Sequence, residues 1–512
     1  MISDWQQLPD LIPPQPVAVD CRRQQQAWLL ECLQENKNTD YGRQHNFDRI
    51  ASMESFRDTV PLVSYEDIRP YIERIAAGAT DVLFSGKPLA FERTSGSSGR
   101  EKLIPYSQHS LRDFQRAVLP WLCHLPQQYA ISTGTAYWAV SPAGRQAETT
   151  SGGIPIGMSD AAYLGEALLP FFAHCSAVPP QVGEVSDIRD WQLLSLYYLV
   201  TRQDLVLVSV WSPTFFLLLL EALDHLYQPL QTLLDEGGTL AGHTMAADPA
   251  AVECLHNYHE NRDTRILWPN LQLISCWAAG ASQPFYHTLQ QRFPHVAFQA
   301  KGLLSTEGVV TVPNDDNQPV LTVNSGFYEF LTADGRSLFA HELTTGDEYE
   351  VVMTTAGGLY RYRTGDLVRC GGYTNGLPIL HFMGRGNLTS DLVGEKLHEA
   401  FVAGCLEGIN GFRMVMPRLQ GKPGYLLILD RKIHHTNAAV VEKVEQALAA
   451  NPHYAYARKL GQLSALQPLL LDEPLSAFIN SPVHRETRLG DIKVPALCVK
   501  TAWLDDILES VA

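Results

Sequence analysis

The sequence lacks the features of a disulfide-stabilised or zinc-binding protein. Its nine cysteines among 512 residues are scattered, odd in number and never spaced as Cys-x-x-Cys. This pattern argues against a disulfide framework or a cysteine zinc site and is typical of reduced cytosolic thiols. The first ten residues also lack the basic region and apolar run of a secretory signal. We therefore expect a cytoplasmic protein.

Positive charge is also scarce. Lysine and arginine number 39 against 55 aspartates and glutamates, which gives a formal net charge of −16. Such an acidic surface repels nucleic acid and anionic membranes, so we expect neither as a partner. Hydrophobic residues make up 45% and charged residues 18%, a balance typical of a folded globular chain. The length predicts more than one core.

Uninterrupted hydrophobic runs are few, and the one that imitates a membrane span is Leu205 to Leu223. Ser209, Ser212 and Pro213 interrupt it. The β-branched first half predicts a buried strand, and the part after Pro213 predicts a helix. We favour strand, turn and helix over a membrane span.

The chain shows no internal repeat, and its pattern predicts an α/β protein. The first ninety residues read as helices, including 24–36, and short strands then alternate with helices, as at 136–140, 205–210 and 272–277. Residues 328–370 predict a strand-rich subdomain. After a linker at 384–387 the pattern restarts, with a hairpin near 421–424 and a helix at 437–450. We expect a large N-terminal domain of layered sheets and helices (1–384) and a small mobile α+β domain (385–512).

A loop of small residues suggests a phosphate site. Gly96 and Gly99 let the backbone approach an anion, with hydroxyl donors from Ser95, Ser97 and Ser98 and a positive charge on Lys102. The Walker and dinucleotide patterns are both absent. Taken alone, the loop could be an ordinary flexible turn.

Two carboxylates in later motifs strengthen this hypothesis. Glu307 follows Thr306 in a turn and could hold Mg²⁺, which binds few protein oxygens together with substrate phosphate. Asp366 follows Gly365 at a predicted strand end, where it could accept both ribose hydroxyls. The alternatives are a helix-capping threonine with a solvated glutamate, and a turn aspartate.

Together these motifs resemble a known superfamily. The segments TSGSSGREK (94–102), LLSTEG (303–308), YRTGD (362–366) and GRGN (384–387) are similar to those of adenylate-forming enzymes. A closer resemblance, over roughly 61–500, is to the Gretchen Hagen family of acyl acid–amido synthetases. The segments that carry it are TTSGGIPIGMSD (149–160), LWPNLQLI (267–274), WAAGA (277–281), GDEYEVVMTTAGGLYRYRTGD (346–366) and GDIKVP (490–495).

The resemblance implies a two-step reaction. A carboxylic acid attacks ATP to give an acyl-adenylate and pyrophosphate, and an amino acid's amine then displaces AMP to form an amide. The enzyme's tasks are positioning and charge neutralisation. The implied catalytic residues are Lys102, Thr306, Glu307 (also the Mg²⁺ ligand) and Lys493. The implied nucleotide-binding residues are Ser95, Gly96, Ser97, Ser98, Gly99, Gly280, Ala281, Ser305, Asp366 and Arg385.

The sequence departs from the superfamily in two places. The aromatic residue usually found two positions before the Ser-Thr-Glu is Leu303 here, so adenine would either stack elsewhere, on Tyr328 or Phe327, or stack more weakly. Asn387 stands where the superfamily often has a hinge aspartate.

Several alternatives stay open. The acceptor could be the thiol of coenzyme A or of a carrier protein, or the chain could be a non-catalytic nucleotide-binding relative. Lys493 could be a surface lysine. The acyl pocket is expected along 138–163 and 208–216, where Trp138, Trp211, Phe215 and Phe216 suit an aryl or apolar acid. Those aromatics could equally belong to the core.

Overall fold

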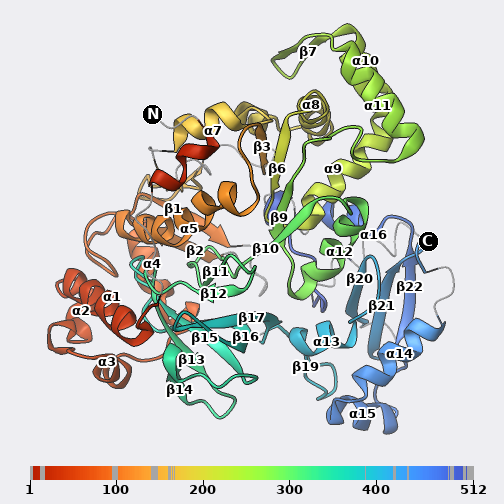
Figure 1. Ribbon diagram of the computed structural model, residues 1–512. Coiled ribbons are helices and arrows are strands. Elements are labelled where there is room, and N and C mark those ends of the chain that lie inside the picture. The colour runs from red at the N-terminus through yellow and green to blue at the C-terminus, as the bar shows by residue number, and fades with distance from the viewer. Residues whose placement is uncertain are drawn as a thin grey trace. The chain divides into compact units, whose positions relative to one another are not determined.

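The chain folds into two compact units, seen in the computed structural model of Figure 1. Unit 1 comprises Met1–Ser132, Gln146–His174 and Lys301–Met383, and unit 2 comprises Thr133–Arg145, Cys175–Ala300 and Gly384–Ala512. The structure describes residues 4–11, 18–94, 102–139, 148–158, 163, 165, 168–386, 388–418, 422–434, 438–481, 484, 489–499 and 503. The elements below are those of the described residues.

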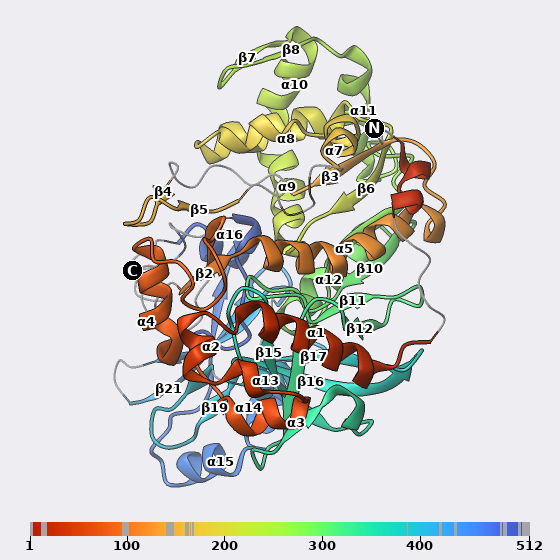
Figure 2. The same ribbon diagram turned by 90° about the vertical axis from the view of Figure 1, so that its left-hand side faces the viewer.

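Helices dominate the start of unit 1, as expected. They are α1 (Cys21–Asn36), α2 (Asp40–Gln44), α3 (Met53–Thr59) and α4 (Tyr65–Ala76), followed later by α5 (Gln108–Gln128) and α7 (Leu169–Cys175). The Asp20 side chain caps α1, and Ser52 forms a capping box on α3. Gln25 of α1 bonds to the backbone of Val323, Gly326 and Tyr328, which fixes the helix against β13. Figure 2 shows α1 to α4 from the side.

A seven-stranded sheet confirms the predicted strand-rich subdomain in unit 1. Its order is β11-β12-β17-β16-β15-β13-β14. The strands are β11 (Thr311–Pro313), β12 (Pro319–Leu321), β13 (Phe327–Leu331), β14 (Ser337–Phe339), β15 (Glu348–Thr354), β16 (Tyr362–Thr374) and β17 (Leu377–Arg385). The buried pair Arg361–Glu329, bonded at 2.9 Å, ties the start of β16 to β13. Because both charges are buried and paired, loss of either partner would leave an uncompensated charge.

A second, four-stranded sheet of unit 1 carries the flanks of the serine- and glycine-rich loop. Its order is β2-β1-β5-β4, with β1 (Ala90–Thr94), β2 (Lys102–Tyr106), β4 (Glu148–Thr149) and β5 (Pro155–Ile156). β1 and β2 are antiparallel, and Thr94 pairs with Lys102. The loop residues 95–101 therefore connect two paired strands, and Lys102 stands where the loop enters β2.

Unit 2 is built on a sheet of order β10-β9-β6-β3. β3 (Thr135–Trp138), β6 (Leu205–Ser209) and β9 (Leu273–Trp277) run parallel, and β10 is Ala297–Lys301. α8 (Ile188–Val200), α9 (Pro213–His225) and α12 (Gln283–Arg292) share one hydrophobic core with these strands. The strands expected at 136–140, 205–210 and 272–277 correspond to β3, β6 and β9. Within the described residues, the expected and observed ends differ by at most two residues.

The membrane-like run folds as strand, turn and helix, which confirms the favoured interpretation. β6 ends at Ser209, and α9 begins at Pro213 in its first turn. Among the helices of the described residues, none has the length and apolar character needed to cross a bilayer.

In the C-terminal sheet of unit 2, the strands β20 (Arg413–Arg418) and β21 (Gly424–Asp430) are buried on both faces. The order of this sheet is β20-β21-β22, with β22 at Gln467–Leu471. Met414 and Ile428 point into the core shared with the parallel sheet, whereas Val415 and Leu427 pack in a second core with α14 (Ala438–Leu448) and α15 (Pro452–Lys459). Successive side chains of a strand point to opposite faces of the sheet, so neighbouring residues enter different cores.

The remaining elements of unit 2 complete these layers. They are η4 (Pro180–Glu184), α10 (Tyr227–Glu236), the hairpin β7 (Gly238–Leu240) and β8 (His243–Met245), α11 (Pro249–Asn261), η5 (Gly280–Ser282), the pair β18 (Thr389–Ser390) and β19 (Leu397–His398), α13 (Glu399–Cys405), α16 (Pro474–Ile479) and η8 (Leu489–Asp491). The predicted hairpin and the predicted helix near the C-terminus correspond to β20–β21 and α14.

The boundary between the units differs in part from the expected division into two consecutive domains. The chain passes from unit 1 to unit 2 for the last time between Met383 and Gly384, at the expected linker. Unit 2, however, also contains Thr133–Arg145 and Cys175–Ala300. The linker itself starts inside a strand, because β17 continues to Arg385. Mobility of the C-terminal part stays a prediction.

Candidate active site

The Ser-Thr-Glu motif forms the tip of a tight hairpin in unit 1. Ser305 and Gly308 exchange two backbone hydrogen bonds, of 3.0 and 3.2 Å, and Leu304 pairs antiparallel with Val309. Thr306 and Glu307 are the two central residues, both half-buried. The next element is the strand β11, so the helix-capping interpretation of Thr306 is wrong. A two-residue turn holds both side chains in a defined direction.

The hairpin tip is bonded to the strand that carries Lys102. Tyr106, the last residue of β2, donates its hydroxyl to the Thr306 carbonyl oxygen at 2.7 Å. Burial raises the pKa of Tyr106, and the charge of Glu92 acts in the same direction. The phenol therefore stays protonated and keeps its role as donor.

Lys102 lies between two tyrosines of unit 1. Its Nζ is 3.4 Å from the Tyr362 hydroxyl and 5.3 Å from the centroid of the Tyr65 ring. Tyr362 begins β16, four residues before Asp366. The Lys102, Ser-Thr-Glu and Asp366 motifs are therefore linked through Tyr106 and Tyr362, neither of which the sequence singled out. Ser95, Gly96, Ser97, Ser98 and Gly99 lie outside the described residues.

Asp366 lies inside a strand, which corrects the expectation that it stands at a strand end. β16 continues through it to Thr374. Gly365 has a φ of +77°, a conformation that favours glycine, and the register with β15 shifts at this point. The Asp366 amide donates to Thr364 Oγ1 at 3.0 Å, and the residue is only 3% exposed. The irregularity shapes the backbone around the carboxylate.

If Asp366 holds the ribose hydroxyls, we expect Asp366→Ala to weaken ATP binding by about 2–4 kcal/mol through loss of two charge-assisted hydrogen bonds. Isothermal calorimetry measures this change directly. Asp366→Asn, which keeps the shape and removes the charge, is the control for the packing of a buried residue. Unchanged ATP affinity in both folded variants would make Asp366 a purely structural residue.

Tyr328 is a core residue, and its assignment to the nucleotide site needs correction. Tyr328 and Phe327 are each 1% exposed within the core of unit 1. The Tyr328 hydroxyl bonds to the Val309 carbonyl oxygen and lies 3.1 Å from Ser325 Oγ. A ring enclosed in this way has no free face on which adenine could stack. Neither Tyr328 nor Phe327 therefore belongs to the nucleotide site. Tyr328 instead supports the Ser-Thr-Glu hairpin from behind.

The remaining predicted residues belong to unit 2. Gly280 and Ala281 are the first two residues of η5, which begins three residues after the end of β9, and Gly280 has a φ of +58°. The Arg385 amide donates to Glu399 Oε2 at 3.0 Å, and Glu399 Oε1 accepts from the Ala496 amide at 3.2 Å. One buried carboxylate thus links the end of β17 to the segment that carries Lys493. A side chain at Gly384 would come within 2.9 Å of that carboxylate.

Lys493 packs on an aromatic ring of the parallel sheet. Its Nζ lies 4.3 Å from the centroid of the Trp277 ring, and Trp277 ends β9. The Trp277 and Trp211 rings have centroids 5.9 Å apart. Lys493 is an exposed residue, and its ammonium lies against Trp277, three residues before Gly280 of η5. Trp277 belongs to the WAAGA segment quoted from the sequence. The sequence alone, however, did not indicate that its side chain contacts Lys493.

The expected acyl pocket is only partly compatible with the structure. Phe215 and Phe216 are fully buried in the core of unit 2, so for these two the core interpretation is right. Trp138 and Trp211 are half-buried at the carboxyl ends of β3 and β6. Ligands of parallel α/β sheets bind at this edge, so these two remain candidates.

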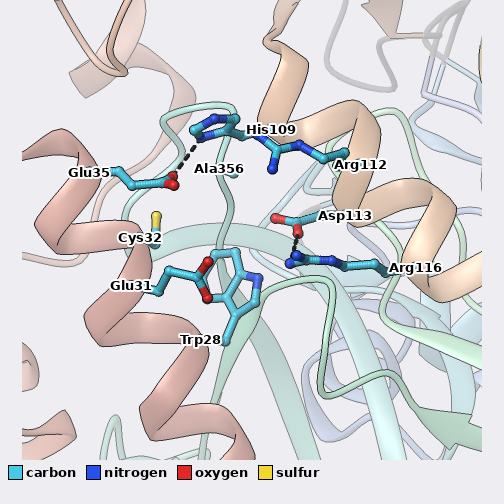
Figure 3. A pocket seen from close by; sticks show the side chains of 9 residues that line it. All are labelled: Trp28, Glu31, Cys32, Glu35, His109, Arg112, Asp113, Arg116 and Ala356. Atoms are coloured by element: carbon cyan, nitrogen blue, oxygen red, sulfur yellow. Dashed lines mark hydrogen bonds and ion pairs between the residues drawn. The ribbon is translucent and has the colours of Figure 1, made fainter.

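A charged pocket of unit 1 contains no predicted site residue (Figure 3). It is lined by Trp28, Glu31, Cys32, Glu35, His109, Arg112, Asp113, Arg116 and Ala356. His109 Nδ1 lies 2.5 Å from Glu35 Oε2, and Arg116 lies 3.3 Å from Asp113. Burial raises the pKa of the Asp113 carboxyl to about 6, although the Trp28 indole and Arg116 oppose this shift.

We expect Asp113 to make stability fall as pH rises from about 4 to about 6. The unfolded chain releases this proton near pH 4 and the folded chain only near 6, so the folded state loses up to about 3 kcal/mol across that window. Asp113→Asn removes the titration, so its melting temperature relative to the parent should be higher at pH 7.5 than at pH 4.5. Asp316→Asn, at an exposed carboxylate, should show no such pH-dependent gain. Equal behaviour of the two variants would contradict the buried titration.

The fold is shared with solved ligase structures. It matches the structure titled AtGH3.15 acyl acid amido synthetase in complex with 2,4-DB with a TM-score of 0.84 and 20% identity over 96% of this chain and 94% of that one. It also matches a 2-hydroxyisobutyryl-CoA ligase in the postadenylation state with a TM-score of 0.57 and 14% identity over 94% and 91% of the chains. The fold is that of the adenylate-forming ligases.

Within that class the family is clear. The model of the GH3 family N-terminal domain matches residues 16–298, and that of the GH3 family central domain matches 319–385. The chain belongs to the GH3 family, which confirms the Gretchen Hagen resemblance. It is 26% identical to jasmonoyl–L-amino acid synthetase JAR4 of Nicotiana attenuata over 72% of this chain and 70% of that protein. It is 24% identical to indole-3-acetic acid-amido synthetase GH3.2 of Arabidopsis thaliana over 75% and 77%.

Proposed function

We propose that this chain is an acyl acid–amido synthetase that joins a carboxylic acid to the amine of an amino acid. The observation that carries the proposal is the match to the GH3 family over 16–298 and 319–385, which includes the Lys102 and Asp366 motifs. The Ser-Thr-Glu motif lies in the segment between these two ranges. Two related proteins are named as a jasmonoyl–L-amino acid synthetase (JAR4) and an indole-3-acetic acid-amido synthetase (GH3.2), which supports the proposal.

The residues of unit 1 have the chemistry that adenylation needs. A carboxylate is a poor electrophile, and ATP supplies the AMP leaving group while pyrophosphate departs. Lys102, held beside the Tyr362 hydroxyl, would neutralise phosphate charge next to the loop 95–101. Thr306, on a turn fixed by Tyr106, would orient the acid or the phosphate. Asp366 would hold the ribose.

Glu307 fits a magnesium ion carried by the nucleotide. No group of three or more His, Cys, Asp or Glu that could hold a metal occurs among the described residues. Magnesium keeps several waters and needs only one or two protein carboxylates beside substrate phosphates, which a single half-buried glutamate can provide. When bound, the ion would neutralise charge on the phosphates.

Transfer completes the proposed reaction. The amine of the amino acid attacks the acyl carbon, the bond to AMP breaks, and the amine gives up a proton. Lys493, carried by unit 2, would serve the first step by stabilising charge on the reacting acid and phosphate. The half-buried Trp138 and Trp211 favour an aryl or apolar acid.

The test is a screen of acids for pyrophosphate release, with mass spectrometry of the products. Each acid is offered with ATP and Mg²⁺ alone, with a mixture of amino acids, and with coenzyme A. We expect an acyl-adenylate in the first arm and an amide in the second, with aryl acids preferred. A thioester in the third arm without amide would make the chain a thioester-forming ligase. Nucleotide binding without adenylate from any acid would favour a non-catalytic relative.

A further inference from the structure

The ammonium of Lys493 sits on a platform of two tryptophans in unit 2. The Trp277 ring lies beneath it at 4.3 Å, and the Trp211 ring lies beside Trp277 at an angle of 38°. The Trp277 amide also donates to the Trp211 carbonyl oxygen at 2.9 Å, so adjacent strand ends hold the two residues together. A cation over the face of an indole is the strongest form of cation–π contact in proteins.

The backbone that carries Lys493 is anchored on the same unit. Ile492 and Val494 are buried in the core shared with the parallel sheet, whereas Lys493 between them is exposed. Ala496 accepts from the Val415 amide at 2.8 Å and donates to Glu399 at 3.2 Å. These bonds fix the stem of Lys493, but its four-carbon side chain would still rotate without a partner at its tip.

We propose that Trp277 is a positioning residue for adenylation, which holds the ammonium of Lys493 at the carboxyl end of β9 ready for the acid and the phosphate. The inference rests on the proposed function. Trp277 is followed within three residues by Gly280, so the platform leads directly into the segment expected to line the nucleotide. The ring restricts the position of the ammonium and leaves its charge intact.

The kinetic test compares Trp277→Leu, Trp277→Phe, Lys493→Ala and the double variant Trp277→Leu/Lys493→Ala. We expect Trp277→Leu to slow adenylation by about threefold to thirtyfold, the range of a cation–π contact, and Trp277→Phe to slow it less. Transfer from supplied acyl-adenylate should stay within about twofold. In the Lys493→Ala background, Trp277→Leu should have almost no further effect, because the two residues act as a unit. Additive losses, or equal slowing of both steps, would overturn the proposal.

A labelling experiment needs no activity. The Trp277 ring covers one side of the Lys493 amine, so loss of most of the ring should open the amine to an acylating reagent. We expect Lys493 in Trp277→Leu or Trp277→Phe to label several-fold faster than in the parent, with the exposed Lys459 as internal control. Unchanged labelling would overturn the contact and the proposal. If the variants label faster but the parent adenylates no acid, the contact is real and the proposed function is wrong. The positioning role in adenylation is then rejected as well.

Discussion

Lys493→Ala is expected to slow formation of acyl-adenylate by at least about a hundredfold, while amide formation from supplied acyl-adenylate stays close to normal. The physical reason is that a cation placed where charge develops acts only in the step in which that charge appears. In unit 2 the lysine is held on Trp277 beside the start of η5, whose residues are expected to line the nucleotide. Single-turnover kinetics on each half-reaction measure the two effects separately.

The matched control for this prediction is Lys459→Ala, at an exposed lysine on α15 of the same unit. It removes the same charge far from the Trp277 platform in sequence and should change neither step by more than about twofold. Equal slowing of both steps in Lys493→Ala, or of neither, would return Lys493 to the status of a surface lysine.

Glu307→Gln should reduce adenylation by at least about a hundredfold and leave the melting temperature within a few degrees of the parent. The substitution keeps the shape of a half-buried side chain at the tip of the hairpin, so the bonds between Ser305 and Gly308 persist. It removes the negative charge proposed to hold Mg²⁺, and an amide oxygen is a much weaker ligand. Pyrophosphate release at increasing Mg²⁺ concentration is the measurement.

The magnesium dependence separates metal binding from a structural role. We expect Glu307→Gln to recover part of its rate at high Mg²⁺, because weaker binding can be offset by concentration. Asp316→Asn, which removes one charge from an exposed turn of unit 1, should follow the parent curve. A rate near that of the parent at low Mg²⁺ in Glu307→Gln would refute the metal role.

Much of the fold followed from local pattern. The β-branched run 205–209 and the proline at 213 set a strand and a helix start, because side-chain shape and the missing proline amide act locally. The segments EVVMTT and LYRYRTGDLVRC likewise predicted a strand-rich region. The sequence pattern did not predict which aromatic residues are buried. Tyr328 and Phe216 were possible ligand contacts, but both are buried by neighbours that are distant in the sequence.

The division of the chain shows the same limit. The sequence placed a break at 384–387 but could not show that β20 and β21 turn one face toward the core of the parallel sheet. Met414 and Val415 are both apolar, and only the tertiary structure decides which of the two cores each one enters.

The sequence by itself determined the family, the order of the motifs and the residue types that suit phosphate, ribose and magnesium, because these follow from side-chain chemistry. Only the tertiary structure decided which residues hold them in place. Tyr106 on Thr306, Tyr362 on Lys102 and Trp277 under Lys493 are contacts between residues at least 200 positions apart. A hydrogen bond or a cation–π contact depends on a few ångströms of separation, and that separation is set by the packing of whole sheets, which no local pattern records.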